Sequence, residues 1–295
     1  MRINTNVSSL VAQEANKQTN VTLAGSLEKL STGFKINKAS DDASGLSIAD
    51  KLRTQANGLN QAVANGNSAI TLTQIADKAM AEQSNILDIV KQKLIQASTA
   101  TTSYEGIQAI GKDVKKLLEQ INNIASQTTY NGTNLLQGTA SAGSVTSGAV
   151  LTFQMGTTSA DVIKTAGGTL SNTAGLNGMS ALLVSAGGSF GANAATNAVS
   201  AQTAARAQLK QVDSALTQLN GWRADFGSTQ NQLESSIRNL MTQVTNTKAA
   251  ESVIRDVDYA QESANFNKQN IISQAGTYAI SQANNVSQNV MKLLQ

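Results

Sequence analysis

Two carboxylates, Asp256 and Asp258, are the pair of side chains in this sequence whose spacing most suggests acid–base chemistry. Both precede the last helical pattern of the chain, where the helix dipole favours negative charge, so a solvated helix start explains them better. The sequence contains no His, which removes the commonest general base and metal ligand. It contains no Cys, which removes thiol nucleophiles, thiolate metal sites and disulfides. We therefore predict that the chain is not an enzyme and has no catalytic, cofactor or metal site.

Binding of phosphate groups, nucleic acid or a membrane is also unsupported. The Gly-Gly pairs at 167–168 and 187–188 lack the following helix and the Lys of a phosphate loop. The net charge is +3 and the basic residues are scattered, so no patch for nucleic acid or a membrane surface stands out. No stretch approaches the ~18 apolar residues of a membrane span, and residues 1–18 lack the apolar core of a signal peptide. A cytoplasmic protein and a protein exported with its N-terminus uncleaved both fit.

The composition favours long helices that meet through narrow interfaces. Aromatic residues make up 3% of the chain, too few to fill the broad core of a compact globule. The apolar residues are instead Ala, Leu, Ile and Val, and there is no Pro to interrupt a helix. We therefore expect a mainly α protein, with long antiparallel coiled-coil helices from both termini and a small β-hairpin region in the middle.

The first half of the chain carries three helical patterns. The first has large apolar residues three and four positions apart, which places them on one stripe of a helix: Leu23, Leu27, Leu30 and Phe34. Capping residue types at 37–42 mark a break before a second helix, which is weakened by Gly58 and Gly66 because each glycine costs ~1 kcal/mol in a helix interior. A third pattern covers 107–124 and ends near an Asn-Gly turn signal at 131–132.

The middle of the chain differs from both ends. Residues 138–197 are rich in Gly, Ala, Ser and Thr and are almost uncharged. Alternating apolar and polar residues predict a β-hairpin over 151–165, with a loop longer than the tightest kind. Residues 181–184 are a second candidate strand. We expect this least periodic part of the chain to lie on the surface.

The last third of the chain carries the strongest pattern. Large apolar residues with coiled-coil spacing form what we call the rod seam: Leu209, Val212, Leu216, Leu219, Phe226, Leu233, Ile237 and Leu240. Arg223 and Gln230 take two positions of this ladder, and Arg223 either reaches out to solvent or bridges to a neighbouring subunit; we favour the bridge. The final helix repeats the spacing with smaller residues, opposite a face of Gln, Asn and Ser: Ile272, Ala275, Ala279, Ala283, Val286, Val290 and Leu293.

The two ends of the chain, residues 1–34 and 260–295, lack what stabilises a lone helix. They have few ion pairs four residues apart and little apolar area to bury. The simplest resolution is that they pair with each other and then with neighbouring molecules. We therefore expect them to be largely disordered in the isolated monomer and to order on assembly. The alternative is that both ends dock permanently on the parent bundle.

Several short motifs, in order along almost the whole chain, resemble those of bacterial flagellins. They lie at 3–6, 27–37, 41–46, 255–260, 274–277, 283–284 and 288–294. The resemblance implies a structural subunit that polymerises with itself into a flagellar filament through paired terminal helices. It also implies an order of domains along the chain: 1–42 in an inner helical domain, 43–165 in a rod domain with the hairpin, 166–200 as a short variable surface segment, 201–250 in the rod domain, and 251–295 in the inner domain.

The same resemblance implies partners and a location. Flagellins are secreted unfolded through the flagellar type III apparatus, after an export chaperone has held the C-terminal segment. They are then incorporated beneath a distal cap, in continuity with hook-junction proteins, so the expected location is the extracellular flagellum. The Ser and Thr residues of the middle segment are either simply solvated or O-glycosylated, as in some relatives, and the sequence leaves both open.

One segment departs from the pattern of many flagellins. Residues 86–96 align with an arginine-rich motif that the vertebrate innate-immune flagellin receptor recognises. Ile89 stands where a key arginine would be, and Lys91, Gln92 and Lys93 replace the flanking pattern. This resembles flagellins that escape the receptor, so we expect weak binding. The alternative is that Ile89 is a seam residue and that the alignment is shifted.

Two other classes share part of the sequence pattern. Another axial flagellar protein, such as a hook–filament junction component, has terminal heptad helices but resembles these motifs less and usually contains more β structure. A secreted coiled-coil effector or pore component explains the heptads but not the motifs at 255–260 and 288–294.

Overall fold

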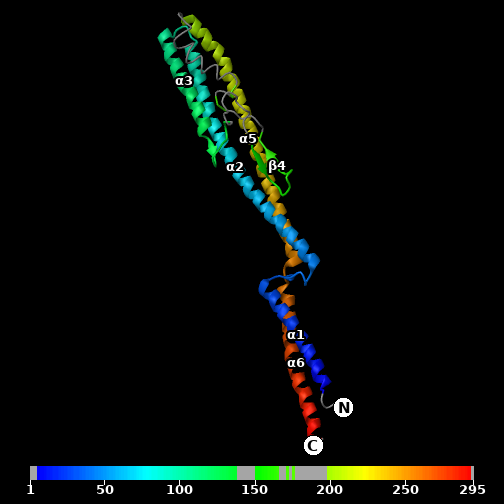
Figure 1. Ribbon diagram of the computed structural model, residues 1–295. Coiled ribbons are helices and arrows are strands. Elements are labelled where there is room, and N and C mark those ends of the chain that lie inside the picture. Colours follow the sequence, from blue (N-terminus) through cyan, green and yellow to red (C-terminus); the bar gives the residue numbers. More distant parts are fainter. Residues whose placement is uncertain (1–4, 138–149, 166–170, 173–174, 177–197, 294–295) are drawn as a thin grey trace. The chain divides into compact units, whose positions relative to one another are not determined.

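The computed structural model describes residues 5–137, 150–165, 171–172, 175–176 and 198–293. Most of them lie in long helices: α1 (Val7–Thr32), α2 (Ala43–Ala97), α3 (Tyr104–Gln127), α5 (Ala198–Arg255) and α6 (Tyr259–Leu293) (Figure 1). Two short antiparallel strand pairs lie between α3 and α5: β1 (Thr129–Tyr130) with β2 (Thr133–Asn134), and β3 (Thr152–Gln154) with β4 (Val162–Lys164). The expected mainly α fold with a small hairpin region is confirmed.

The chain divides into two compact units. Unit 1 contains Met1–Asn57 and Gln243–Gln295, and unit 2 contains Gly58–Thr242, so the division falls within α2 and α5. The candidate strand at 181–184 and most of the segment 166–200 lie outside the described residues.

Unit 1 begins with a helix that is capped at both ends. The Asn6 side chain accepts a hydrogen bond from the backbone N–H of Ser9, which satisfies one of the free donors at the start of α1. At the other end, Gly33 adopts a left-handed conformation with φ 77° and donates its N–H to the carbonyl of Lys29. Because Gly33 ends the helix, Phe34 lies beyond it, and the expectation that Phe34 continues the helical stripe was wrong.

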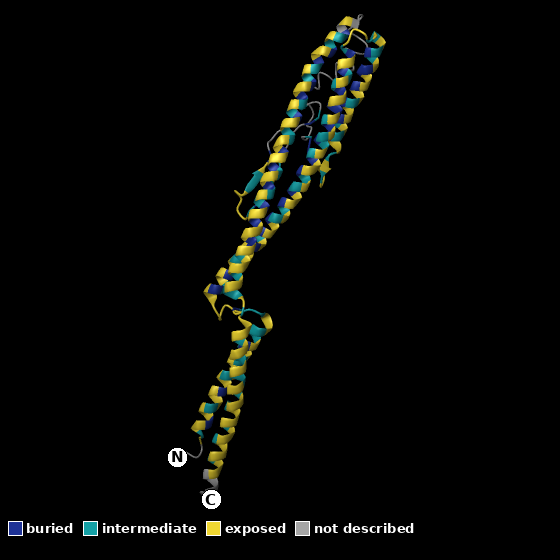
Figure 2. Cartoon of the chain, turned by 180° about the vertical axis from the view of Figure 1, so that it is seen from behind, coloured by how far each residue is buried: buried dark blue, intermediate teal, exposed yellow. Residues whose placement is uncertain are grey.

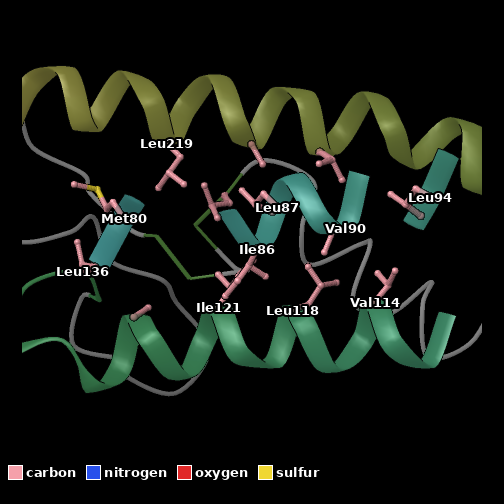
Figure 3. Packing of buried hydrophobic residues seen from close by; sticks show 14 of the residues in the cluster. Met80, Ile86, Leu87, Val90, Leu94, Val114, Leu118, Ile121, Leu136 and Leu219 are labelled. Carbon is pink, nitrogen blue, oxygen red and sulfur yellow. The ribbon is translucent and has the colours of Figure 1, made fainter. Parts of the chain in front are cut away.

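Unit 2 is held together by large aliphatic side chains of three helices. Met80, Leu87 and Leu94 of α2 are fully buried between α3 and α5 (Figure 3). Leu118 of α3 and Leu219 of α5 face them from either side, also fully buried. The interface is an elongated strip of Leu, Ile, Val and Met, as the low aromatic content favours.

The β3–β4 hairpin explains the two glycines inside α2. A Cβ atom on Gly66 would lie 2.7 Å from the Met155 methyl group and 2.8 Å from Cγ1 of Ile237, and one on Gly58 would lie 2.8 Å from the Thr157 methyl group. The glycines therefore let the loop after β3 approach the helix backbone closely. The helix continues through both positions because this packing offsets their low helix propensity.

Candidate assembly surface

The α1–α6 pair of unit 1 contains the residues that we expected to drive self-assembly. The two helices lie side by side and antiparallel, with Asn6 near Ala283 at one end and Gly33 near Tyr259 at the other. A pair of this kind has one face turned inward, between the helices, and a larger surface turned outward. Compared with a soluble coiled coil, the inward face carries less apolar bulk and the outward surface carries more.

The inward positions of α1 recur every three and four residues and are mostly small or polar. They are Ser9, Ala12, Asn16, Thr19, Leu23, Ser26 and Leu30, all buried or half-buried. The inward positions of α6 follow the same spacing, and all are half-buried: Phe266, Gln269, Ser273, Gly276, Ile280, Ala283 and Ser287. We call these fourteen residues the polar seam. Their heptad spacing is that of a coiled coil, but most of them lack the apolar bulk that normally stabilises one.

The amide side chain of Asn20, which is exposed and is not one of these fourteen residues, connects the two helices at the edge of the polar seam. The Asn20 side chain donates to Oδ1 of Asn16 at 3.0 Å and accepts from the Ser273 hydroxyl at 2.8 Å. Asn16 itself is 8% exposed, and a Cβ atom added to Gly276 would lie 3.2 Å from its Nδ2 atom. A slip along the pair would replace Gly276 opposite Asn16 by a residue with a side chain. The asparagine–glycine contact therefore favours one register, as a buried polar residue does in a coiled coil.

Backbone hydrogen bonds join residues 33–35, after α1, to residues 255–257, at the end of α5 and before α6. We call these two segments the crossing. The Lys35 N–H donates to the Arg255 carbonyl at 2.6 Å, and the Val257 N–H donates to the Gly33 carbonyl at 3.0 Å. The Arg255 guanidinium lies 4.3 Å from the centroid of the Phe34 ring, a cation–π contact. Phe34 thus contributes to this crossing, outside the helical stripe.

The carboxylates around this crossing hold backbone N–H groups. Asp258 accepts from the N–H groups of Ala260 and Gln261 at 2.9 and 3.2 Å, which is how a helix start is capped. Asp41 accepts from the N–H groups of Asn37 and Lys38, and these hydrogen bonds lower the pKa of its carboxyl group below the ordinary value. Within the described ranges, no group of three or more acidic residues could hold a metal ion.

Large apolar side chains lie on the outside of the pair. They are Val7, Leu10, Val11, Val21 and Leu27 on α1, and Ile271, Ile272, Tyr278 and Val286 on α6. Figure 2 shows both helices exposed over most of their surface. Ile271 and Tyr278 are seven residues apart on one face of α6 and are 67% and 74% exposed. A pair with mostly small or polar residues inside and large apolar side chains exposed outside has the pattern of a surface that other molecules cover.

Comparison with known proteins gives the family. A model of the bacterial flagellin N-terminal helical region matches residues 3–141, and a model of the bacterial flagellin C-terminal helical region matches residues 209–294. The chain belongs to the bacterial flagellins. The flagellin of Bacillus subtilis (strain 168) is 37% identical over 313 residues, with 100% of both chains covered. The flagellar filament 31.3 kDa core protein of Treponema maltophilum is 34% identical over 297 residues, again with 100% of both chains covered.

The solved structure of a Bacillus cereus flagellin is also similar. It matches with a TM-score of 0.47 and 26% identity, over 64% of this chain and 94% of that one. Among the described helices of this flagellin, none is both long and apolar enough to cross a membrane.

The structure distributes the expected assembly residues of this flagellin over two surfaces. Leu23 and Leu30 lie half-buried in the polar seam. The other members with described side chains, apart from Phe34, are exposed: Leu27, Ile272, Ala275, Ala279 and Val286. The side chains of Val290 and Leu293 lie outside the described part of the chain. The sequence interpretation overlooked Asn16, Ser273 and Gly276, although their spacing of three and four residues from other small residues was a usable signal.

The rod seam of this flagellin lies in unit 2. Val212, Leu219, Phe226, Leu233, Ile237 and Leu240 are buried, and Leu209 and Leu216 are half-buried. The Nε atom of Arg223 lies 3.0 Å from Oδ1 of Asp77 within the same chain, and a bridge from Arg223 to a neighbouring subunit stays a prediction. Both side chains of this ion pair are about one-third exposed, at 34% each.

The segment 86–96, which we expect to align with the receptor motif, lies in α2 of unit 2 and has one buried face and one exposed face. Ile89 is 43% exposed, so it is not a residue of the buried interface. Its neighbours Leu87 and Val90 occupy that interface instead. Gln92 is exposed, whereas Lys91 and Lys93 form ion pairs with Asp213 and Asp113 at 2.7 and 2.9 Å. These contacts raise the pKa of the Lys91 ammonium and lower the pKa of the Asp113 carboxyl group.

Proposed function

We propose that this flagellin is a structural subunit that polymerises with copies of itself into the extracellular flagellar filament through the α1–α6 pair of unit 1. The observation that carries the proposal is the row of large apolar side chains on the outside of that pair. Similarity to proteins named as flagellar filament core proteins supports it. Other copies of the chain are the occupants that cover the exposed surface.

The energetics of the pair support assembly as its source of stability. Covering a Leu, Ile or Tyr side chain contributes about 1.5–3 kcal/mol. A side-chain hydrogen bond within the polar seam contributes only about 1 kcal/mol, since the same groups bind water in the open state. The pair therefore has more to gain from contacts with other subunits than from its own inner face. On this basis α1 and α6 open readily in the isolated chain and close firmly on assembly.

The domain arrangement follows from the same proposal. Residues 1–42 and 251–295 form the inner domain that assembles. Residues 43–165 and 201–250, with the rod seam and the hairpin, form the rod domain, and the segment 166–200 supplies variable surface. The apolar core of unit 2 supports a rod that keeps its fold with or without neighbouring subunits, because its large side chains are already buried.

Export completes the proposal. The chain crosses the flagellar type III apparatus unfolded, after an export chaperone has held its C-terminal segment, and joins the filament beneath the cap, in continuity with hook-junction proteins. We expect cells with a working flagellar export apparatus to secrete the chain, and we expect no secretion from cells in which that apparatus has been inactivated. Equal appearance in both culture media would contradict this route.

The exposed apolar surface of α6 provides the direct test of assembly. The double substitution Ile271→Asn and Tyr278→Asn removes two large apolar side chains that are mostly exposed on the outside of the pair. We expect the critical concentration for seeded polymerisation to rise at least about tenfold, because a loss of about 1.4 kcal/mol changes an equilibrium tenfold. Sedimentation of filaments over a series of protein concentrations measures it.

A matched control lies in unit 2. Val199 at the start of α5 is 70% exposed, so Val199→Asn makes the same chemical change outside the α1–α6 pair. We expect its critical concentration to stay near that of the unchanged chain. An unchanged value for the α6 double variant, or an equal rise for Val199→Asn, would count against this surface as the place of assembly.

The surface around Ile89 supports a second expectation about partners. An exposed isoleucine offers no charge or hydrogen-bond donor in place of arginine, and Lys91 and Lys93 are engaged by carboxylates. We expect purified monomer to activate the vertebrate innate-immune flagellin receptor weakly, and Ile89→Arg to increase the signal from receptor-bearing cells. Strong signalling by the unchanged chain would contradict the expectation.

A further inference from the structure

Asn131 and Gly132 form the two-residue turn between β1 and β2. Both residues have positive φ, 50° for Asn131 and 77° for Gly132, as the tight turns of two-residue hairpins require. Asn131 is exposed, and a Cβ atom on Gly132 would meet no other atom within 4 Å. The turn is therefore an Asn-Gly pair with open space around it and with little structure to restrain it.

We propose that Asn131 is a site of spontaneous deamidation in the folded protein. In this reaction the backbone nitrogen of Gly132 attacks Cγ of the Asn131 side chain and forms a five-membered succinimide ring. A C–N bond forms, the bond from Cγ to the side-chain nitrogen breaks, and ammonia leaves. Water then opens the ring at one of its two carbonyl groups and gives aspartate or isoaspartate. Glycine favours the attack because it has no side chain beside the attacking nitrogen.

The chain contains four other Asn-Gly pairs. One of them, Asn177–Gly178, lies outside the described residues, and the other three are helical. Asn57–Gly58 and Asn65–Gly66 lie inside α2, and Asn220–Gly221 lies inside α5. In an α-helix the glycine N–H is held by a carbonyl four residues earlier, and the backbone is fixed in a conformation that keeps this nitrogen from the side chain. Gly66 is also buried against Met155 and Ile237. Reaction at any of these pairs requires a helix to open locally.

The hairpin offers much less resistance to opening. β1 and β2 have two residues each, with Thr129 opposite Asn134 and Tyr130 opposite Thr133. A two-stranded ribbon of this size is marginal by itself, and local opening is easiest where few buried contacts hold the backbone. Among the four Asn-Gly pairs that the structure describes, Asn131 is therefore the reactive one, and the helices protect the other three.

The two products differ in what they do to the turn. Aspartate is accepted at this turn position and adds only a negative charge. Isoaspartate routes the main chain through the side-chain carboxyl carbon and lengthens the loop by one atom, so a two-residue turn no longer fits the pairing of β1 with β2. Leu135 and Leu136 follow at once and are buried at the edge of the unit 2 core. Isoaspartate formation therefore strains the backbone next to Leu135 and Leu136, at the edge of the unit 2 core.

Peptide mapping of the full-length chain during storage in mildly alkaline buffer tests the proposal. Conversion of Asn131 to the acid is expected to be at least about tenfold faster than conversion of Asn57, Asn65 or Asn220, the ratio that about 1.4 kcal/mol of extra opening cost produces. A parallel sample in concentrated urea is the control for sequence alone, and there the four sites are expected to react at similar rates. An isoaspartate-specific methylation assay of the isolated peptide that contains residue 131 reports the second product.

A variant supplies the remaining control. Asn131→Gly keeps residues suited to the turn, since Gly-Gly also adopts positive φ at both positions, but it has no side-chain amide to lose. The methylation signal of the peptide that contains residue 131 is expected to disappear in this variant, whereas the signal of the peptide that contains Asn177 is expected to stay unchanged. Equal rates at Asn131 and the helical sites in the folded chain, or an intact Asn131 under conditions where they react, would overturn the proposal.

Discussion

Removal of residues 260–295 is expected to leave a helical, soluble chain that adds to no filament. The deletion takes away α6, with its exposed Ile271, Tyr278 and Val286, and also removes the partner of α1. A helix such as α1, with Ser and Asn on its inner face, is not stable by itself in water. Unit 2 keeps its buried core, so most of the helical circular dichroism signal remains. Seeded polymerisation followed by electron microscopy measures the loss of filament growth.

A point substitution separates loss of the pair from loss of chain length. Gly276→Leu adds a side chain whose Cβ atom alone would lie 3.2 Å from Nδ2 of Asn16, so the two helices cannot close in the same register. We expect this full-length variant to polymerise as poorly as the shortened chain. Normal filament growth from the chain without 260–295 would remove the case for assembly through paired terminal helices.

Replacement of Leu87 by Ala is expected to lower the free energy of unfolding of unit 2 by about 2–5 kcal/mol. Leu87 is fully buried between α3 and α5, and the surrounding side chains can collapse only partly into the space it leaves. The loss is large beside the ~5–15 kcal/mol that holds a typical domain together. Urea unfolding of the monomer followed by circular dichroism measures the difference.

The neighbouring exposed residue is the control for this substitution. Ile89→Ala removes apolar atoms of the same kind two positions away, but Ile89 is 43% exposed, so the expected change is within about 0.5 kcal/mol. Comparable losses from the two substitutions would mean that α2 does not present Leu87 inward and Ile89 outward. The same two substitutions therefore also test whether Ile89 lies on the surface, as the expectation of weak receptor binding requires.

Sequence patterns were informative where large apolar residues mark the interior. Leu219, Phe226 and Leu233 repeat at seven-residue intervals, and burial of their side chains in unit 2 follows the ladder. The hairpin was equally visible, because apolar and polar residues alternate at 152–154 and 162–164. In both places, hydrophobicity and burial point in the same direction.

The α1–α6 pair could not be derived in this way, because its apolar residues lie mainly outside. The hydrophobic stripe on Ile272, Ala275 and Ala279 indicates an apolar surface that is covered by some other helix. It does not indicate whether that helix belongs to the same chain or to another molecule. The inner face depends on Asn16 and Gly276, whose roles come from size and amide geometry. Gly58 and Gly66 show the same limitation, since only the hairpin packed on α2 explains them.

The amides and small side chains of the polar seam also set the calorimetric behaviour of the subunit. The heat-capacity increase on unfolding follows newly exposed apolar area and is reduced by newly exposed polar area. Separation of α1 from α6 therefore adds little to it, and the increment of the dissolved subunit comes mainly from the Leu, Ile and Val side chains of unit 2. Melting of a filament also exposes the outer apolar surface of the α1–α6 pair to water. The heat-capacity increase per chain is therefore larger for the filament than for the dissolved subunit, and the stability of the filament falls more steeply on cooling.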